Sequence, residues 1–173
     1  MTDTRNAIRR LSEYGQSIWL DNVSRKLISS GELQRLIDLG IKGLTSNPTI
    51  FEKALSNSSD YDESIVHHVG LGKSASEIFE ELTIEDIGSV ADALIPVYQA
   101  TGRKDGFASL EVNPHLAHDT QGTVSEAVRL FSALNRPNVM IKVPATPEGI
   151  PAISQLIGEG INVNVTLIFS LKT

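Results

Sequence analysis

Residues 138–144 read Asn-Val-Met-Ile-Lys-Val-Pro, which is the alternation of a β-strand that carries a lysine near its end. Side chains along a strand point to opposite faces in turn, so the two valines and the isoleucine share one face, and Met140 and Lys142 share the other. Pro144 limits the strand because it has no N–H for the ladder. Apolar surroundings disfavour the charged lysine, and the neutral amine is the form that attacks a carbonyl to make a Schiff base. The stretch therefore predicts a strand that ends on a nucleophilic lysine.

Four further apolar runs have the length of strands, and stretches with helical spacing separate all five. These runs cover residues 17–22, 41–45, 106–112 and 161–169. The intervening stretches carry helix signals. Residues 25–39 precede Gly40, a helix stop, and Ser74 with Glu77 has capping-box spacing. Strands that alternate with helices are typical of a parallel sheet, so we expect a single α/β domain over residues 1–173.

Two further pairs repeat the spacing of a capping box. Thr83 with Asp86, and Thr123 with Glu126, each stand before a helical apolar stripe. We expect a helix to begin at each pair, and a short helix to open at Pro147.

Polar residues gather at the carboxyl ends of the predicted strands. The set comprises Asp21, Asn47, Glu111, Lys142, Asn164 and Thr166. Parallel strands bring their carboxyl ends to one mouth, where α/β proteins bind their ligands. A lysine, two carboxylates, two amides and a hydroxyl at one mouth favour carbonyl chemistry with Lys142 as the nucleophile.

Each of these residues also has a structural interpretation. Lys142 is alternatively a half-buried lysine whose head reaches water. Asp21 and Glu111 alternatively cap helices or pair with cations, and Asn47 before a proline is alternatively a turn residue. The mouth that they share with Lys142 favours catalysis for Asp21 and Glu111. The residues that flank Lys142 favour a functional lysine, and Asn47 can have both roles at once.

Histidines raise the question of a metal site. His115 and His118 are three residues apart next to an aspartate, but no further ligand with matching spacing follows, so no metal site is expected. His67 and His68 are expected on a solvated helix surface, as is the acidic stretch 77–86.

Composition narrows the classes of function. The chain has 15 lysines and arginines against 21 aspartates and glutamates, a formal charge of −6, which argues against binding to nucleic acid or to an anionic membrane. It contains no cysteine, which rules out disulfides and thiol nucleophiles. No apolar run is long enough to span a bilayer, so a cytoplasmic protein is expected.

Two motifs resemble the transaldolase family. Residues 43–51, Gly-Leu-Thr-Ser-Asn-Pro-Thr-Ile-Phe, are similar to its first signature, and residues 139–149, Val-Met-Ile-Lys-Val-Pro-Ala-Thr-Pro-Glu-Gly, are similar to the segment that carries its Schiff-base lysine. The likeness extends over nearly the whole chain. It implies a parallel (β/α)8 TIM-type barrel, of which about five of the eight strands lie in this chain.

The resemblance also implies roles for the polar residues. Lys142 would form an iminium with a ketose phosphate, and Asp21 would handle the proton of the C4 hydroxyl. Glu111 would move protons through a water held with Thr166, and Asn47 and Asn164 would orient the hydroxyls of the bound unit. These are roles that carboxylates and amides suit chemically. No metal or organic cofactor is implied.

The length of the chain departs from this family. A complete barrel takes about 250 residues, so the sequence is expected to be the amino-terminal portion of one. The arginines and the serine that grip the sugar phosphate in the family lie on later strands. Two alternatives to a transaldolase remain open: a simpler Schiff-base aldolase that releases dihydroxyacetone, and an inactive partial barrel. An open sheet is also expected to favour self-association.

Overall fold

The computed structural model describes residues 7–170 and contains one five-stranded parallel sheet, with the strands in the order in which they occur in the chain. The strands are β1 (Trp19–Asp21), β2 (Gly43–Thr45), β3 (Phe107–Glu111), β4 (Val139–Pro144) and β5 (Val163–Thr166). Each lies within or next to one of the five predicted runs. The predicted α/β class and parallel sheet are therefore confirmed.

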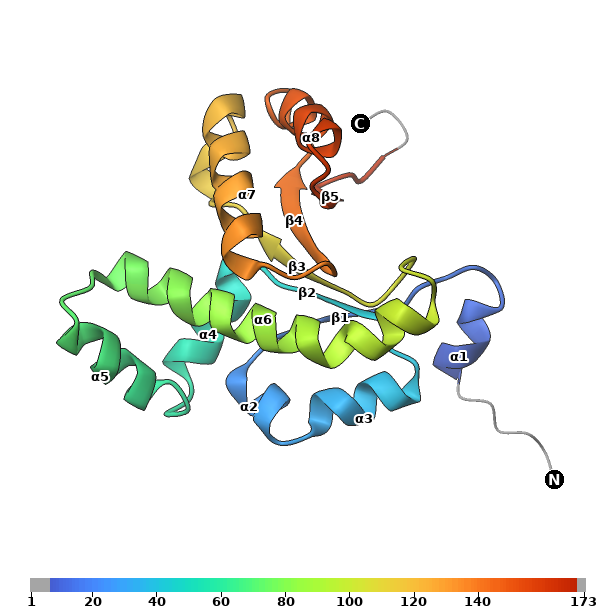
Figure 1. Cartoon of the computed structure of the whole chain (residues 1–173), viewed down its shortest axis with the longest axis horizontal. Helices are drawn as coiled ribbons and strands as arrows, with labels where there is room; N and C mark the ends of the chain where they lie inside the picture. Colours follow the sequence, from blue (N-terminus) through green and yellow to red (C-terminus); the bar gives the residue numbers. More distant parts are fainter. Residues whose placement is uncertain (1–6, 171–173) are drawn as a thin grey trace.

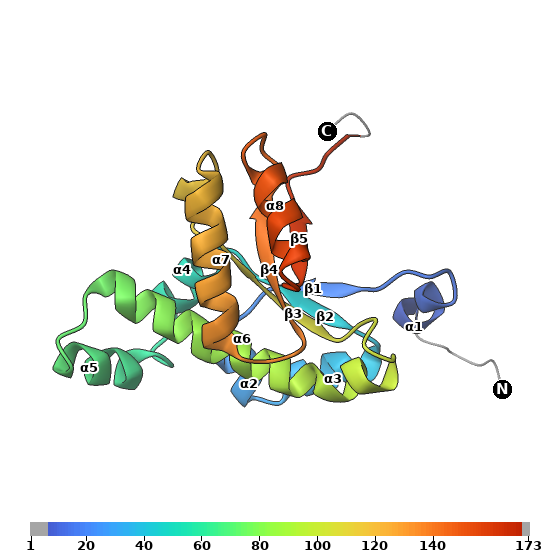
Figure 2. The same cartoon turned by 45° about the horizontal axis from the view of Figure 1, so that its top comes forward.

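The strand order explains why the helices lie on one side of the sheet. Every connection leads to the next strand in the same direction, and crossovers between parallel strands are right-handed, so each helix returns over the same face. The helices in this part of the chain are α1 (Ala7–Ser12), α2 (Arg25–Ser29), α3 (Glu32–Leu39), α4 (Pro48–Ser56), α5 (Asp62–Gly70), α6 (Ala75–Ala100), α7 (Thr120–Leu134) and α8 (Gly149–Gly158), and a 3₁₀ turn, η1, spans Pro114–Leu116. Figure 1 and Figure 2 show α6, α7 and α8 along the outside of a curled sheet. This is the arrangement of a partial TIM barrel.

The core lies between the sheet and this layer of helices. The side chains of β4 that were predicted to share a face, Val139, Ile141 and Val143, are fully buried there. Leu156 of α8 and Ile87 of α6 are buried in the same cluster. The opposite, inner face of the sheet is therefore left to Lys142 and its neighbours.

Four helix boundaries differ from the prediction. The helix expected to begin at Thr123 begins at Thr120 instead, with Asp119 as its N-cap. Residues 25–39 form two helices, because Gly31 takes a left-handed conformation with φ of 80° between them. Gly40 ends α3 as predicted, again in the left-handed region. Thr83 starts no helix: α6 runs through it from the Ser74 capping box, and the Thr83 hydroxyl donates to the carbonyl of Phe79. The last helix begins at Gly149 rather than at Pro147.

Asp86 was predicted on a solvated face and is instead buried. Its carboxylate accepts hydrogen bonds from the Tyr61 hydroxyl (2.7 Å) and from Arg25 Nε (3.1 Å). Burial raises the pKa of Asp86, against the opposing effect of Tyr61 and Arg25. The contacts tie α2 and the start of α5 to the middle of α6. The local sequence gave no sign of them because the partners are 25 and 61 residues away.

His68 was also predicted on the surface, and it is instead buried between α5 and α6. Only 7% of the residue is exposed, and its Nδ1 lies 3.0 Å from a carboxylate oxygen of Glu81. His67 is exposed as predicted.

Among residues 7–170, none of the helices is both long and apolar enough to cross a membrane. Within the same residues the sheet does not close, and β1 and β5 form its two edges.

Candidate active site

The register of the strands aligns three of the predicted site residues in one row. Glu111 pairs with Lys142 across β3 and β4, and Lys142 pairs with Asn164 across β4 and β5. Partners in a parallel ladder point to the same face, so the three side chains share the inner face, away from the helices. Thr166 lies two residues further along that face, in register with Pro144.

Lys142 is held between two oxygen atoms. Its Nζ lies 3.3 Å from Oε2 of Glu111 and donates a hydrogen bond of 3.2 Å to the backbone carbonyl of Ser46. The Lys142 and Glu111 side chains are only 12% and 15% exposed. This adjacency places a proton acceptor directly beside the amine.

Asn164 and Thr166, the inner-face residues of β5, are held in different ways. Asn164 Nδ2 donates a hydrogen bond of 3.0 Å to the Ser109 hydroxyl, which fixes the direction of its amide. The Thr166 carbonyl accepts from the Ala145 backbone N–H at 2.9 Å, which holds the backbone at the end of β5. Both side chains are half-buried.

Asn47 has the structural role that the sequence left open. It is the N-cap of α4, and its Oδ1 accepts a hydrogen bond of 3.0 Å from the Ile50 backbone N–H, with Pro48 in the first turn. No hydrogen bond within residues 7–170 uses Nδ2 of Asn47. The cap thus orients the amide, and its N–H groups are not engaged by the described residues.

Asp21 stands apart from the lysine row. It ends β1, is exposed, and pairs in register with Thr45. Thr45 in turn pairs with Ser109, which lies two residues before Glu111 on β3. Asp21 is therefore on the same inner face, but two residues closer to the amino-terminal ends of the strands than the row of Lys142. In the part of the chain that the structure describes, no ion pair joins Asp21 to Lys142.

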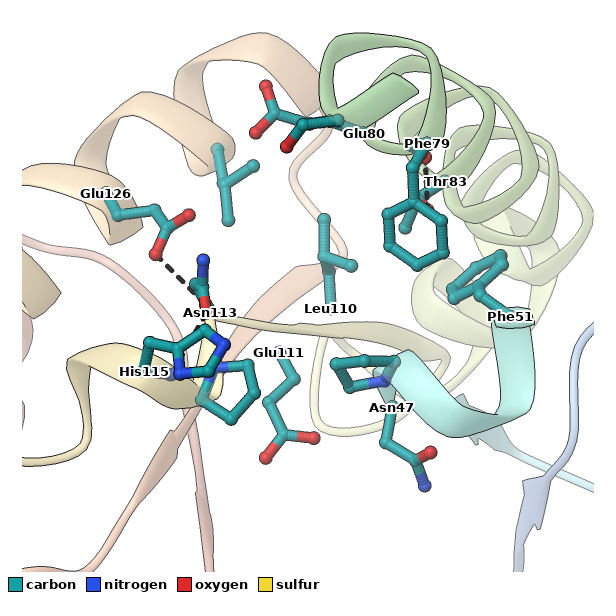
Figure 3. A pocket seen from close by; sticks show the side chains of 14 residues that line it. Asn47, Phe51, Phe79, Glu80, Thr83, Leu110, Glu111, Asn113, His115 and Glu126 are labelled. Atoms are coloured by element: carbon teal, nitrogen blue, oxygen red, sulfur yellow. Dashed lines mark hydrogen bonds between the residues drawn. The ribbon is translucent and has the colours of Figure 1, made fainter. Parts of the chain in front are cut away.

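A cavity of about 320 Å³ adjoins this mouth between α4, α6 and α7. Phe51, Phe79 and Leu110 form its apolar wall, and Asn47 and Glu111 stand at its boundary. In Figure 3 the side chains of Asn47 and Glu111 both point away from that wall. The cavity therefore meets the lysine row at Glu111, and neither Lys142 nor Asn164 lines it.

No group of three or more metal-ligating side chains occurs among residues 7–170. The histidines weighed for a metal site have other surroundings. His118 Nδ1 lies 3.2 Å from a carboxylate oxygen of Glu148, and His115 lines the cavity. The Glu148 pKa is lowered by its hydrogen bond with His118.

Three polar residues on β3 or at the end of β2 were not foreseen from the sequence. Ser46 supplies the carbonyl that Lys142 contacts, and Ser109 receives Asn164. The Thr45 hydroxyl is buried without a hydrogen-bond partner among the described residues. Ser109 was open to prediction because it shares the period-2 face of Glu111. Ser46 was not, since it acts through its backbone.

Comparison with known proteins agrees with this geometry. The sequence model of the transaldolase/fructose-6-phosphate aldolase family matches residues 18–173. The chain belongs to this family. This transaldolase-family chain is 51% identical over 169 residues to a protein named transaldolase 2 of Nostoc sp. (strain PCC 7120 / SAG 25.82 / UTEX 2576). The matched stretch covers 97% of the chain and 44% of the relative.

A second relative, named transaldolase and from Saccharopolyspora erythraea, is 52% identical over 170 residues, or 98% of the chain and 46% of the relative. A third, named transaldolase 2 and from Streptomyces coelicolor, is 50% identical over 173 residues, or 99% of the chain and 46% of the relative. The transaldolase-family chain thus spans less than half the length of these curated relatives.

Proposed function

We propose that Lys142 forms a Schiff base with a ketose phosphate as the first step of a transaldolase reaction. The reaction transfers a dihydroxyacetone unit from sedoheptulose 7-phosphate or fructose 6-phosphate to an aldose phosphate, a step of the pentose phosphate pathway in the cytoplasm. The observation that carries the proposal is the contact of 3.3 Å between Lys142 Nζ and Glu111 Oε2 on the inner face. A weakly exposed amine beside a proton acceptor is the arrangement that covalent catalysis by lysine needs.

The first half of the reaction makes the iminium. Glu111 takes a proton from Lys142, and the neutral amine attacks the ketose carbonyl to form a carbinolamine. Glu111, through a water held with Thr166, returns a proton to the carbinolamine hydroxyl, which leaves as water. The nitrogen now carries a C=N bond that draws electrons from the neighbouring carbons.

The second half breaks and remakes a carbon–carbon bond. Asp21 removes the proton of the C4 hydroxyl, the C3–C4 bond breaks, and its electron pair moves to the nitrogen as an enamine. The aldose phosphate departs, and a second aldose phosphate accepts the enamine carbon while Asp21 returns the proton. Asn47 and Asn164 orient the hydroxyls of the three-carbon unit through these steps. Water then releases the new ketose from Lys142.

The reaction needs no metal and no organic cofactor, because the iminium is itself the electron sink. Its partners are small sugar phosphates, and the net charge of −6 disfavours nucleic acid and anionic membranes. The residues that grip the phosphate are not part of the proposal for this chain.

Product analysis tests the proposed function. The chain is incubated with fructose 6-phosphate, with and without an aldose phosphate acceptor, and the products are separated. A new ketose phosphate that forms only with acceptor supports transaldolase. Free dihydroxyacetone without acceptor supports the simpler aldolase instead, and no turnover in either case supports the inactive partial barrel.

The proposal also includes self-association through the β5 edge. Leu167, Ile168 and Phe169 follow that strand and are 51%, 52% and 87% exposed, which is apolar surface beside an unpaired strand edge. Sedimentation across a range of protein concentrations tests this, and a monomer at every concentration contradicts it.

A further inference from the structure

The structure assigns Ser46 as a positioning residue for Lys142. The inference rests on the proposed function in so far as Lys142 is the nucleophile. It starts from the hydrogen bond of 3.2 Å that Lys142 Nζ donates to the backbone carbonyl of Ser46, which reaches across β3 from β4 to the end of β2.

The Ser46 hydroxyl fixes where that carbonyl lies. The side chain is fully buried, and its Oγ donates a hydrogen bond of 2.8 Å to the Ser109 carbonyl on β3. The regular pairing of β2 with β3 ends one residue earlier, at Thr45 opposite Ser109. The hydroxyl thus continues the attachment of β2 to β3 by one more residue, and that residue is the one Lys142 contacts.

The carbonyl matters for the direction of the lone pair on Lys142. A neutral amine has two N–H groups and one lone pair. One N–H of Lys142 points to the Ser46 carbonyl, so the lone pair cannot be directed at that oxygen and is limited to the remaining positions around Nζ. Covalent catalysis depends on such alignment, and a misplacement of about 1 Å can reduce a rate about 100-fold.

Ser109 also contacts the row of Glu111, Lys142 and Asn164 on its β5 side, through Asn164. Its carbonyl receives Ser46, and its hydroxyl receives Nδ2 of Asn164 at 3.0 Å. Two buried or half-buried hydrogen bonds therefore link β2, β3 and β5 around the amine. Loss of the Ser46 hydroxyl releases the β2 side of this link and leaves the β5 side intact.

The experiment compares wild type, Ser46→Ala and the control Ser132→Ala. Ser132 also donates from its hydroxyl to a backbone carbonyl, that of Val128 at 2.8 Å, but on the exposed side of α7. Two rates are measured for each protein. The first is trapping of Lys142 by fructose 6-phosphate and borohydride, at a pH where the rate no longer rises. The second is reductive methylation of Lys142 by formaldehyde and cyanoborohydride, relative to the exposed Lys104 of the same sample.

We expect Ser46→Ala to lower the sugar-adduct rate about 10- to 100-fold, because a large substrate needs the aligned lone pair. We expect it to raise the relative methylation of Lys142 about 2- to 10-fold, as the loss of one hydrogen bond frees the amine for a small reagent. Ser132→Ala should match wild type in both assays. Unchanged relative methylation in Ser46→Ala overturns the inference, as does a fall in both rates that Ser132→Ala shares.

Methylation separates this inference from the proposed function. If wild type forms no sugar adduct but Ser46→Ala alters methylation, the proposed function fails and the positioning role stands. Circular dichroism and urea unfolding of Ser46→Ala confirm that the compared proteins are folded.

Discussion

Replacing Glu111 by glutamine removes the charge beside Lys142 and keeps the shape of the side chain. At the 3.3 Å that separates Nζ from Oε2, Coulomb's law gives about 1 kcal/mol at the dielectric constant of water and about 5 kcal/mol at an effective value of about 20. The low exposure of both side chains, 12% and 15%, puts the pair toward the upper part of this range. Glutamine also accepts no proton from the amine.

The loss of this attraction does not by itself slow the reaction, since it no longer favours the ammonium form. Because glutamine can neither take a proton from Lys142 nor return one to the carbinolamine, we expect Glu111→Gln to slow adduct formation with fructose 6-phosphate by about 10²- to 10⁴-fold, which is the usual contribution of a general acid–base residue. The rate is measured by trapping with borohydride in a single turnover, and the free energy of unfolding is measured with urea on the same samples. The unfolding measurement separates a chemical effect from a loss of fold.

Glu126→Gln is the matched control. Glu126 lines the same cavity, and its side chain is 17% exposed, close to the value for Glu111. Its carboxylate accepts from the Asn113 backbone N–H instead of contacting the lysine. A Glu111→Gln protein that is folded and retains more than about a tenth of the wild-type rate would refute the reasoning, and so would an equal loss in Glu126→Gln.

Two further predictions concern stability. Leu156→Ala is expected to lower the free energy of unfolding by about 2–5 kcal/mol, because the side chain is fully buried in the core. The neighbouring Ile157 is 60% exposed, so Ile157→Ala should change that free energy by less than about 0.5 kcal/mol. Urea unfolding measures both variants, and equal effects would contradict the packing. The hydrogen bonds from Arg136 lower the pKa of Asp92 below its ordinary value of 3.8, so this carboxylate contributes stability above that pH and the contribution is lost as the pH falls through the lowered pKa. The difference in unfolding free energy between wild type and Asp92→Asn should then shrink as the pH is lowered below about 4, and a difference that stays constant down to pH 2 would contradict the ion pair.

The strands and the inner face could be predicted because their signal is local. In β4, alternation alone separates the buried Val139, Ile141 and Val143 from Lys142. The same period in β3 predicts that Glu111 shares a face with Ser109, whereas the register that pairs Glu111 with the lysine is set between the strands. Five parallel strands in chain order then leave one orientation for the helices.

The errors arose where a local pattern was used for a distant contact. Thr83 and Asp86 have the spacing of a helix start, yet Asp86 is buried against Arg25 and Tyr61, and α6 continues through both. His68 was likewise misplaced on the surface, because its contact with Glu81 joins α5 to α6 and has no local sequence signal. The contact of Ser46 with Lys142 could not be predicted, because it uses a backbone carbonyl, which has no signal in the pattern of side chains.

The positions of the candidate site residues could be predicted only in part. Asn47 has the capping role that the sequence allowed, and its part in substrate binding stays a prediction. Asp21 shares the inner face but not the row of Lys142. Its distance from the lysine depends on the stagger between strands, which no single strand encodes.

The most direct test of the central claim is the identity of the lysine that forms the Schiff base. The protein is incubated with fructose 6-phosphate and borohydride, digested, and mapped by mass spectrometry, with Lys142→Met as the control. The account predicts a reduced sugar adduct on Lys142 and none on the variant. An adduct on Lys53 or Lys73 instead, or an adduct that persists in Lys142→Met, would contradict it.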